Sequence, residues 1–141
     1  MIDRAVVDAS VAVKWVVEER DSGSARGLAS ARLEAPDLLL VECANILWKK
    51  VGIGDLTRPE AAARLGILMR APVTLAASRE LLDVAMELAL EWRHPVYDCL
   101  YAALAMRRNI SLVTADKSLA AAARKKKRDT ARVILLAELQ W

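Results

Sequence analysis

Residues 5–15 read AVVDASVAVKW, a short β-branched run that ends at a carboxylate and is followed at once by an apolar helical pattern. Residues 4–8 are therefore predicted to form a strand, and residues 10–18 a helix with Ser10 as its N-cap. This arrangement places Asp8 at the carboxyl end of a strand. In open α/β sheets, ligands bind outside the carboxyl ends of the strands, so Asp8 is treated as the first residue of a candidate site.

The rest of the chain continues this alternation of short apolar strands and amphipathic helices. Further strands are predicted at residues 33–35, 72–76, 110–113 and 132–135, and further helices at residues 24–33, 37–52, 57–70, 78–92, 96–108 and from 118 onward. Thr57 begins one of these helices, and Glu60 three residues later completes the pattern of a capping box. Strands separated by helices are typical of a mostly parallel sheet covered on both faces, so the predicted fold class is α/β.

Length and composition indicate one ordered domain. The 141 residues are enough to bury a substantial core, and we expect a single domain over residues 1–141. Acidic residues interrupt each apolar run before it reaches the roughly 18 residues of a membrane span, and charges near the start leave no signal-peptide core. Cys43 and Cys99 lack metal-ligand spacing. We therefore expect a cytoplasmic protein with no membrane association and with reduced, buried thiols.

The net charge of +3 is modest, but its distribution is uneven. Residues 124–128 read RKKKR, that is Arg124, Lys125, Lys126, Lys127 and Arg128. Such a density of cations could contact a phosphate backbone. A solvated helix end explains the same run equally well.

Two acids lie inside apolar helical patterns, which is unusual for surface carboxylates. Glu42 is a lone charge in LLLVECANILW, and Asp98 is one in VYDCLYAALAM. An ionised carboxylate left unpaired in a dry interior costs several kcal/mol, so each needs a cation, a set of donors or access to water. Asp116 resembles Asp8 instead, because it follows the predicted strand that contains SLV.

Each acid taken alone has a structural explanation. Asp8 and Asp116 could cap helices, Asp98 could pair with Arg107 or Lys117, and Glu42 could pair with a nearby lysine. Taken together they favour a metal site, since gathered carboxylates raise one another's pKa values unless a cation intervenes. Oxygen ligands suit a hard divalent ion, Mg²⁺ or Mn²⁺, and such an ion suggests phosphoryl chemistry with an activated water.

Three further residues are candidate supporting groups. Asn45 stands one helical turn beyond Glu42 and could orient it or a water, although a buried asparagine that satisfies helix contacts is an equal alternative. Ser10 and Thr114 could donate hydrogen bonds to the acids, or could serve only as N-cap and turn hydroxyls. The two roles of these hydroxyls are compatible.

Other chemistries lack the residues they need. His94 is the sole histidine and precedes a proline, so a histidine-rich metal set is excluded and His94 is interpreted as a loop residue. No glycine-rich phosphate loop is present. Ser10 stands where an aspartyl-phosphate phosphatase would have a second aspartate.

Four segments together resemble a PIN domain and, within that fold, the ribonuclease toxins of VapBC toxin–antitoxin systems. They are VVDASVAVKW with Asp8, APDLLLVECANILWK with Glu42 and Asn45, VYDCLYAALA with Asp98, and LVTADKSL with Asp116. They span nearly the whole chain in the order and spacing of the family. Some PIN domains carry another acid shortly after the fourth, whereas this chain has Lys117 and Ser118 there.

The resemblance implies a three-layer α/β/α sandwich around a parallel five-stranded sheet of order 3-2-1-4-5. It implies a metal-dependent endoribonuclease that forms a homodimer and is held inactive by an antitoxin whose C-terminal segment covers the acidic groove. Asp8, Asp98 and Asp116 would then be the main Mg²⁺ ligands, with Glu42 as a further ligand or as the residue that positions the attacking water. Lys14, Lys117 and the basic run 124–128 are the candidate RNA contacts.

A competing hypothesis is a PIN-fold module that binds RNA or a protein partner without catalysis. An RNA-processing nuclease outside a toxin–antitoxin pair is another alternative. The presence of all four acids favours catalysis.

Overall fold

A computed structural model describes residues 2–125 and 132–139 of the chain. Its elements alternate strand and helix as predicted. In chain order they are β1 (Arg4–Val7), α1 (Ala9–Ala12), η1 (Val13–Trp15), α2 (Ser22–Leu28), β2 (Arg32–Pro36), α3 (Leu38–Gly52), α4 (Arg58–Met69), β3 (Val73–Ala76), η2 (Ser78–Leu81), α5 (Leu82–Trp92), α6 (Val96–Arg108), β4 (Ser111–Thr114), α7 (Lys117–Lys125), β5 (Val133–Leu135) and η3 (Leu136–Glu138).

The five strands form one parallel sheet in the order β3-β2-β1-β4-β5, which confirms the predicted fold class and strand order. The central strand β1 pairs with β2 on one side and β4 on the other, with Val6 in register with Glu34 and Leu112. The chain therefore reverses its direction of travel across the sheet at β1. The carboxyl ends of β1 and β4 flank this switch point, where open α/β sheets bind their ligands.

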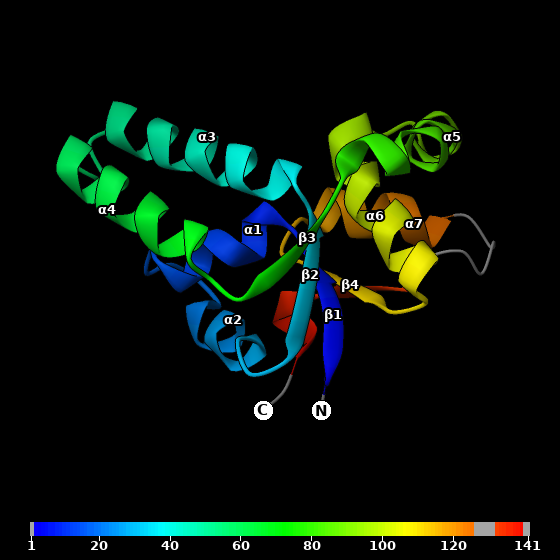
Figure 1. Cartoon of the computed structure of the whole chain (residues 1–141), viewed down its shortest axis with the longest axis horizontal. Helices are drawn as coiled ribbons and strands as arrows, with labels where there is room; N and C mark the ends of the chain where they lie inside the picture. The colour runs from blue at the N-terminus through cyan, green and yellow to red at the C-terminus, as the bar shows by residue number, and fades with distance from the viewer. Residues whose placement is uncertain (1, 126–131, 140–141) are drawn as a thin grey trace.

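The alternation of side chains along the strands gives the sheet two buried faces. Val6, Leu112 and Val133 face the larger apolar cluster, which is formed mainly with α3, α5, α6 and α7. Ala5, Val7 and Val113 face a smaller cluster that includes residues of α1 and α2. Figure 1 shows the strands between α1 and α2 on the left and α6 and α7 on the right.

The helices α3 and α4 form an antiparallel pair that extends beyond the sheet (Figure 1). The predicted capping box begins α4: the Thr57 hydroxyl accepts from the amide of Glu60 at 3.2 Å, and the Glu60 carboxylate accepts from the amide of Thr57 at 3.0 Å. The prediction of this cap is confirmed.

The first helix differs from its prediction. Residues 9–15 form the four-residue helix α1 and the 3₁₀ turn η1, and Asp8 rather than Ser10 is the N-cap. The Asp8 carboxylate accepts from the amide of Val11, whereas the Ser10 hydroxyl bonds to Asp8 and accepts from the amide of Ala115. The second helix is also shorter than the predicted range 24–33, because residues from Arg32 onward pair with β1 and β3.

Cys43 and Cys99 are both free and buried, as predicted. Burial raises the pKa of each thiol to about 12, so both remain protonated at neutral pH. None of the helices in the described ranges has the length and hydropathy that a bilayer span requires.

The cap of α4 gives a first prediction. Thr57→Ala removes a hydroxyl acceptor from the first turn of a helix, and we expect the free energy of unfolding to fall by about 1 kcal/mol. Thr57→Ser keeps the acceptor and is the matched control. Urea denaturation of the three proteins tests the role of the cap, and an equal loss in both variants would contradict it.

Candidate active site

Asp8 lies at the carboxyl end of β1 and its carboxylate is held by neutral donors. Oδ1 accepts from the Ser10 hydroxyl at 2.5 Å and from the amide of Val11 at 3.3 Å, and Oδ2 accepts from the Thr114 hydroxyl. The side chain is buried, with the residue only 4% exposed. Neutral donors, rather than a cation, therefore meet the hydrogen-bonding needs of the buried carboxylate.

The two hydroxyls connect the turn after β1 to the turn after β4. Ser10 Oγ accepts from the amide of Ala115 at 2.9 Å, and Thr114 Oγ1 accepts from the amide of Asp116 at 3.0 Å. Each hydroxyl thus donates to Asp8 and accepts from the segment that carries Asp116. Ser10 and Thr114 fix the position of one acid relative to another.

Desolvation dominates the electrostatics of Asp8. Burial raises the pKa of this carboxyl from 3.8 to about 6, although the hydrogen bonds from Ser10, Thr114 and Val11 act in the opposite direction. Repulsion from Asp98 adds to the rise. A carboxylate in this position is stabilised by any positive charge that approaches it.

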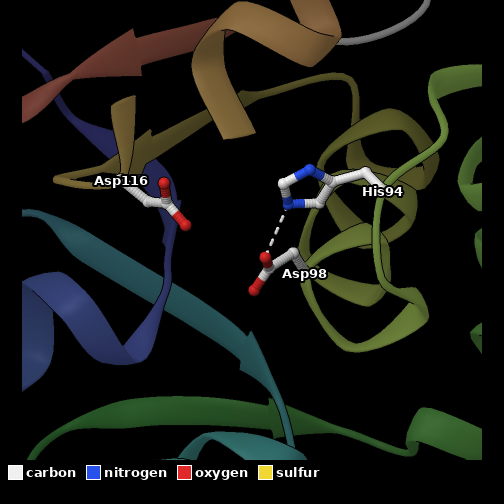
Figure 2. A group of neighbouring side chains, drawn as sticks. All are labelled: His94, Asp98 and Asp116. Carbon is white, nitrogen blue, oxygen red and sulfur yellow. Dashed lines mark hydrogen bonds and ion pairs between the residues drawn. The ribbon is translucent and has the colours of Figure 1, made fainter. Parts of the chain in front are cut away.

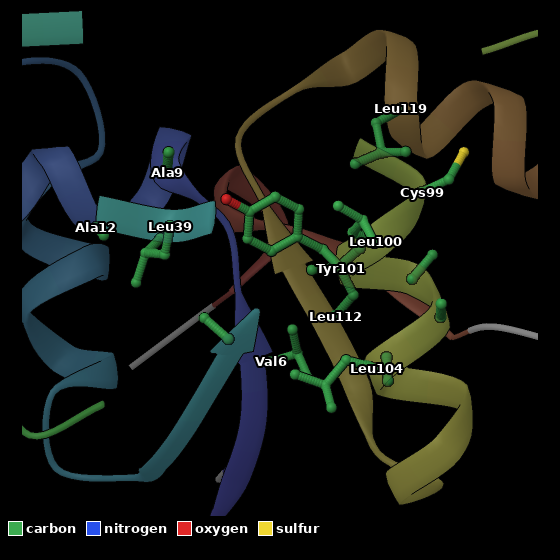
Figure 3. Packing of buried hydrophobic residues seen from close by; sticks show 14 of the residues in the cluster. Val6, Ala9, Ala12, Leu39, Cys99, Leu100, Tyr101, Leu104, Leu112 and Leu119 are labelled. Carbon is green, nitrogen blue, oxygen red and sulfur yellow. The ribbon is translucent and has the colours of Figure 1, made fainter. Parts of the chain in front are cut away.

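Glu42 on α3 meets Tyr101 on α6. The Tyr101 hydroxyl donates to Glu42 Oε1 at 2.5 Å, and the tyrosine is fully buried. Figure 3 shows its ring in the apolar cluster, with the hydroxyl directed towards the beginning of α3. Burial and the charge of Asp98 raise the pKa of Glu42, and burial and the nearby Glu42 raise the pKa of Tyr101, which keeps the phenol protonated.

Asp98 on α6, Asp116 after β4 and His94 before α6 come together in the same region (Figure 2). His94 Nε2 lies 2.7 Å from Asp98 Oδ2, and each of the three residues offers a ligand atom within 4.8 Å of the others. Asp116 Oδ1 accepts from the Ser118 amide at 2.9 Å, from the Ser118 hydroxyl at 2.8 Å and from the amide of Leu119 at 3.3 Å. Asp116 therefore caps α7 as well as facing Asp98.

The structure thus brings the four predicted acids into one electrostatic group. Asp98 is the link between them, because it repels Asp8 and Glu42 and lies beside Asp116. No Lys or Arg in the described part of the chain forms an ion pair with any of the four. Crowded oxygen donors that no Lys or Arg of the described residues neutralises fit a divalent metal ion.

The predicted supporting and basic residues differ from one another in exposure and in bonding partners. Asn45 is exposed, so the alternative of a buried asparagine is wrong. Lys14 is buried, and its ammonium bonds to Glu19 at 3.2 Å and to the carbonyl of Arg20 at 2.8 Å. That ion pair, which Glu19 shares with Lys50, holds the Lys14 side chain inside the protein, which contradicts a role as an RNA contact.

Lys117 is exposed directly after Asp116, and Lys125 is exposed at the end of α7. Arg124 bonds to Glu138 and to the carbonyl of Val133. Lys126, Lys127 and Arg128 lie outside the described residues.

Sequence reasoning missed His94 as a member of the site. The prediction of a loop position is confirmed, since His94 lies between α5 and α6. Its spacing of four residues from Asp98 was the available signal, because the turn at Pro95 leads directly into α6 and lets the ring reach back to the first helical turn. A single histidine in a sequence does not by itself indicate a metal site, so the pairing of His94 with a carboxylate was not predicted.

Comparisons with known proteins give a consistent family match. The PIN domain family model matches residues 5–125. Ribonuclease VapC3 of Pyrobaculum aerophilum is 37% identical over 121 residues, which are 83% of this chain and 92% of that protein.

Two solved structures share the architecture. PAE2754 from Pyrobaculum aerophilum matches with a TM-score of 0.69 at 25% identity, over 96% of this chain and 90% of that chain. VapC20 of Mycobacterium tuberculosis, a toxin that cleaves the sarcin–ricin loop, matches with a TM-score of 0.65 at 18% identity, over 84% and 94%. At that identity the second likeness is one of fold.

The buried Asp8 predicts an unusual pH dependence of stability. Because its pKa is raised from 3.8 to about 6, the folded protein keeps a proton that the unfolded chain releases between those values. The free energy of unfolding of the metal-free protein therefore falls as pH rises from about 4 to about 6, by up to about 3 kcal/mol from this group.

Asp8→Asn cannot ionise, so we expect it to be more stable than the wild type at pH 7 in the presence of a chelator. The difference should disappear towards pH 4. Urea denaturation at both pH values measures it, with Asp83→Asn on the exposed surface of α5 as the matched control. An unchanged pH dependence in Asp8→Asn would contradict the raised pKa.

Proposed function

The chain belongs to the PIN-domain family and, within it, to the VapC-type ribonucleases, and from this premise we propose that it is a metal-dependent endoribonuclease and the toxin of a toxin–antitoxin pair. The observation that carries the proposal is the group of four acids at the switch point of the sheet, none of which forms an ion pair with a Lys or Arg among the described residues. The relative with 37% identity is a ribonuclease.

Asp8, Asp98 and Asp116 would hold the ion, with Mg²⁺ as the expected metal and Mn²⁺ as the alternative. Their fit rests on the donor chemistry described above, since each offers a hard oxygen at one edge of the sheet. When bound, such an ion activates a water and offsets the negative charge that develops on the attacked phosphodiester. The residues of the chain supply the positions of the donors and a proton acceptor.

Glu42 is the proposed proton acceptor. Its hydrogen bond to Tyr101 ends on Oε1, which fixes the carboxylate and leaves Oε2 to accept a proton from the attacking water. As the water oxygen bonds to phosphorus, the P–O bond to the leaving ribose oxygen breaks, the proton of the water passes to Oε2, and the leaving ribose oxygen takes up a proton from solvent. Partial burial raises the pKa of Glu42, which suits a group that must take up a proton.

The RNA backbone is proposed to run past α7. Lys117 follows Asp116 directly and is exposed, and Lys125 is exposed at the other end of the same helix. Both can approach phosphates without breaking an ion pair found in the described residues. Arg124 contributes only if its contact with Glu138 opens.

Three further properties follow from the family as proposals. We propose a cytoplasmic location, a cognate antitoxin that covers the acidic site, and a homodimer. For the dimer, α5 presents Leu82, Met86 and Leu90 on successive turns, exposed by 47%, 51% and 69%. A row of exposed apolar residues of this kind suits a self-complementary interface.

The activity is tested by cleavage of structured RNA with Mg²⁺ or Mn²⁺. We expect Asp8→Asn and Asp98→Asn each to reduce cleavage by at least about 100-fold, because each removes a charge from the group that would hold the ion. Circular dichroism and urea denaturation should show that both variants fold. Asp83→Asn is the control and should cleave like the wild type.

Cleavage that survives both substitutions would contradict the site. If the wild type cuts no substrate across a wide RNA panel but still binds RNA or a protein partner, the chain is a binding module instead.

The dimer is tested by sedimentation velocity. Met86→Glu places a charge in the proposed interface, and we expect the dimer to weaken at least about tenfold, or by about 1.4 kcal/mol. Met69→Glu is the matched control, because Met69 is equally apolar and 64% exposed but lies on α4. An equal effect of the two changes, or a monomeric wild type, would contradict this interface.

A further inference from the structure

We propose that His94 supplies a nitrogen ligand to the metal of this site and thereby favours a first-row transition-metal ion over Mg²⁺. The inference rests on the proposed metal-dependent function and adds a donor that the four acids do not contain. Figure 2 shows the imidazole beside Asp98, with the carboxylate of Asp116 directed towards both.

The spacing of the donor atoms suits a shared ion. His94 Nε2 and Asp98 Oδ2 are 2.7 Å apart, and a carboxylate oxygen of Asp116 lies within 4.8 Å of both ligand atoms. Two ligands in adjacent positions of an octahedral ion with bonds of about 2.1 Å lie about 3 Å apart. Small side-chain adjustments would therefore convert the hydrogen bond between His94 and Asp98 into joint coordination.

The imidazole is held in place by the backbone around it. Arg93 ends α5 in a left-handed conformation with φ of 54°, and the His94 amide donates to the carbonyl of Ala89 at 3.1 Å. Pro95 then fixes the entry into α6. The His94 side chain is only 10% exposed, so it faces the acids rather than solvent. A rigid, largely buried ring beside carboxylates has the preorganisation that a ligand needs.

The identity of the donor sets the metal preference. Mg²⁺ binds through oxygen and keeps much of its hydration, whereas imidazole nitrogen is a good ligand for transition metals. Carboxylates joined by one imidazole therefore select against Mg²⁺ more strongly than carboxylates alone. Among the described residues, His94, Asp98 and Asp116 are the group whose ligand atoms come close enough for such a set.

The test uses Mn²⁺ as a paramagnetic probe and the full chain carrying no histidine tag. His94 is the only histidine in the sequence, so growth with ¹⁵N-histidine labels this one imidazole. Pulsed electron paramagnetic resonance of the bound Mn²⁺ should show coupling to an imidazole nitrogen, and the coupling should change from ¹⁴N to ¹⁵N in the labelled protein. Without RNA, this measurement does not depend on catalysis.

His94→Gln gives the second measurement. Its amide can still donate to Asp98, but it lacks the imidazole nitrogen. By titration calorimetry we expect at least a tenfold loss of Mn²⁺ affinity and a change in Mg²⁺ affinity of less than about threefold. His94→Ala, which removes both the donor and the ligand, shows how much the hydrogen bond contributes to each affinity.

Several results would overturn the inference. They are the absence of imidazole coupling in the wild type, equal losses of Mn²⁺ and Mg²⁺ affinity in His94→Gln, and no Mn²⁺ binding at all. The first two would leave the ribonuclease proposal standing if RNA cleavage remains sensitive to Asp8→Asn. Imidazole coupling in a protein that cuts no RNA would support the ligand and contradict the proposed function instead.

Discussion

A carboxylate buried without a cation is the constraint on which the site depends. Asp8 directly follows the central strand, and two hydroxyls and an amide donate hydrogen bonds to its oxygens. These donors are neutral, so the hydrogen-bond requirement of burial is met while the negative charge remains. The same hydroxyls accept hydrogen bonds from backbone amides in the turn after β4. The contacts that bind Asp8 therefore also position Asp116. Fold stability and the electrostatic character of the site are therefore coupled.

Another buried acid of the same sheet is treated in the opposite way. Glu34 on β2 is 8% exposed and bonds to Arg4 at 2.8 Å and to Arg108 at 2.9 Å. These partners lower the pKa of Glu34, whereas burial raises the pKa of Asp8. Two arginines neutralise the buried carboxylate of Glu34, whereas the side chains that bond to Asp8 are uncharged hydroxyls. This contrast marks the switch point as a site for an added positive charge.

Local sequence signals predicted most of the architecture and failed where side chains compete for the same donors. The Thr57 and Glu60 cap was predictable because both partners lie within one helical turn. The Ser10 cap was wrong because Asp8, two residues earlier, accepts from the amide of Val11, and Ser10 accepts from the amide of Ala115 in the turn after β4. Lys14 was predicted as an RNA contact, yet it pairs with Glu19, which Lys50 of α3 also contacts. For Ser10 the missing information was a contact with Ala115, and for Glu19 it was the contact with Lys50, each from a segment far along the chain.

The sequence alone determined that four acids lie at strand ends or in apolar helices, because those positions depend on local periodicity and on the cost of burying charge. It also determined the α/β alternation. Only the tertiary structure decided what each acid meets: Tyr101 for Glu42, and His94 for Asp98. The physical reason is that a helical pattern gives the face on which a side chain lies, whereas its partner depends on how the helices and turns pack around the sheet.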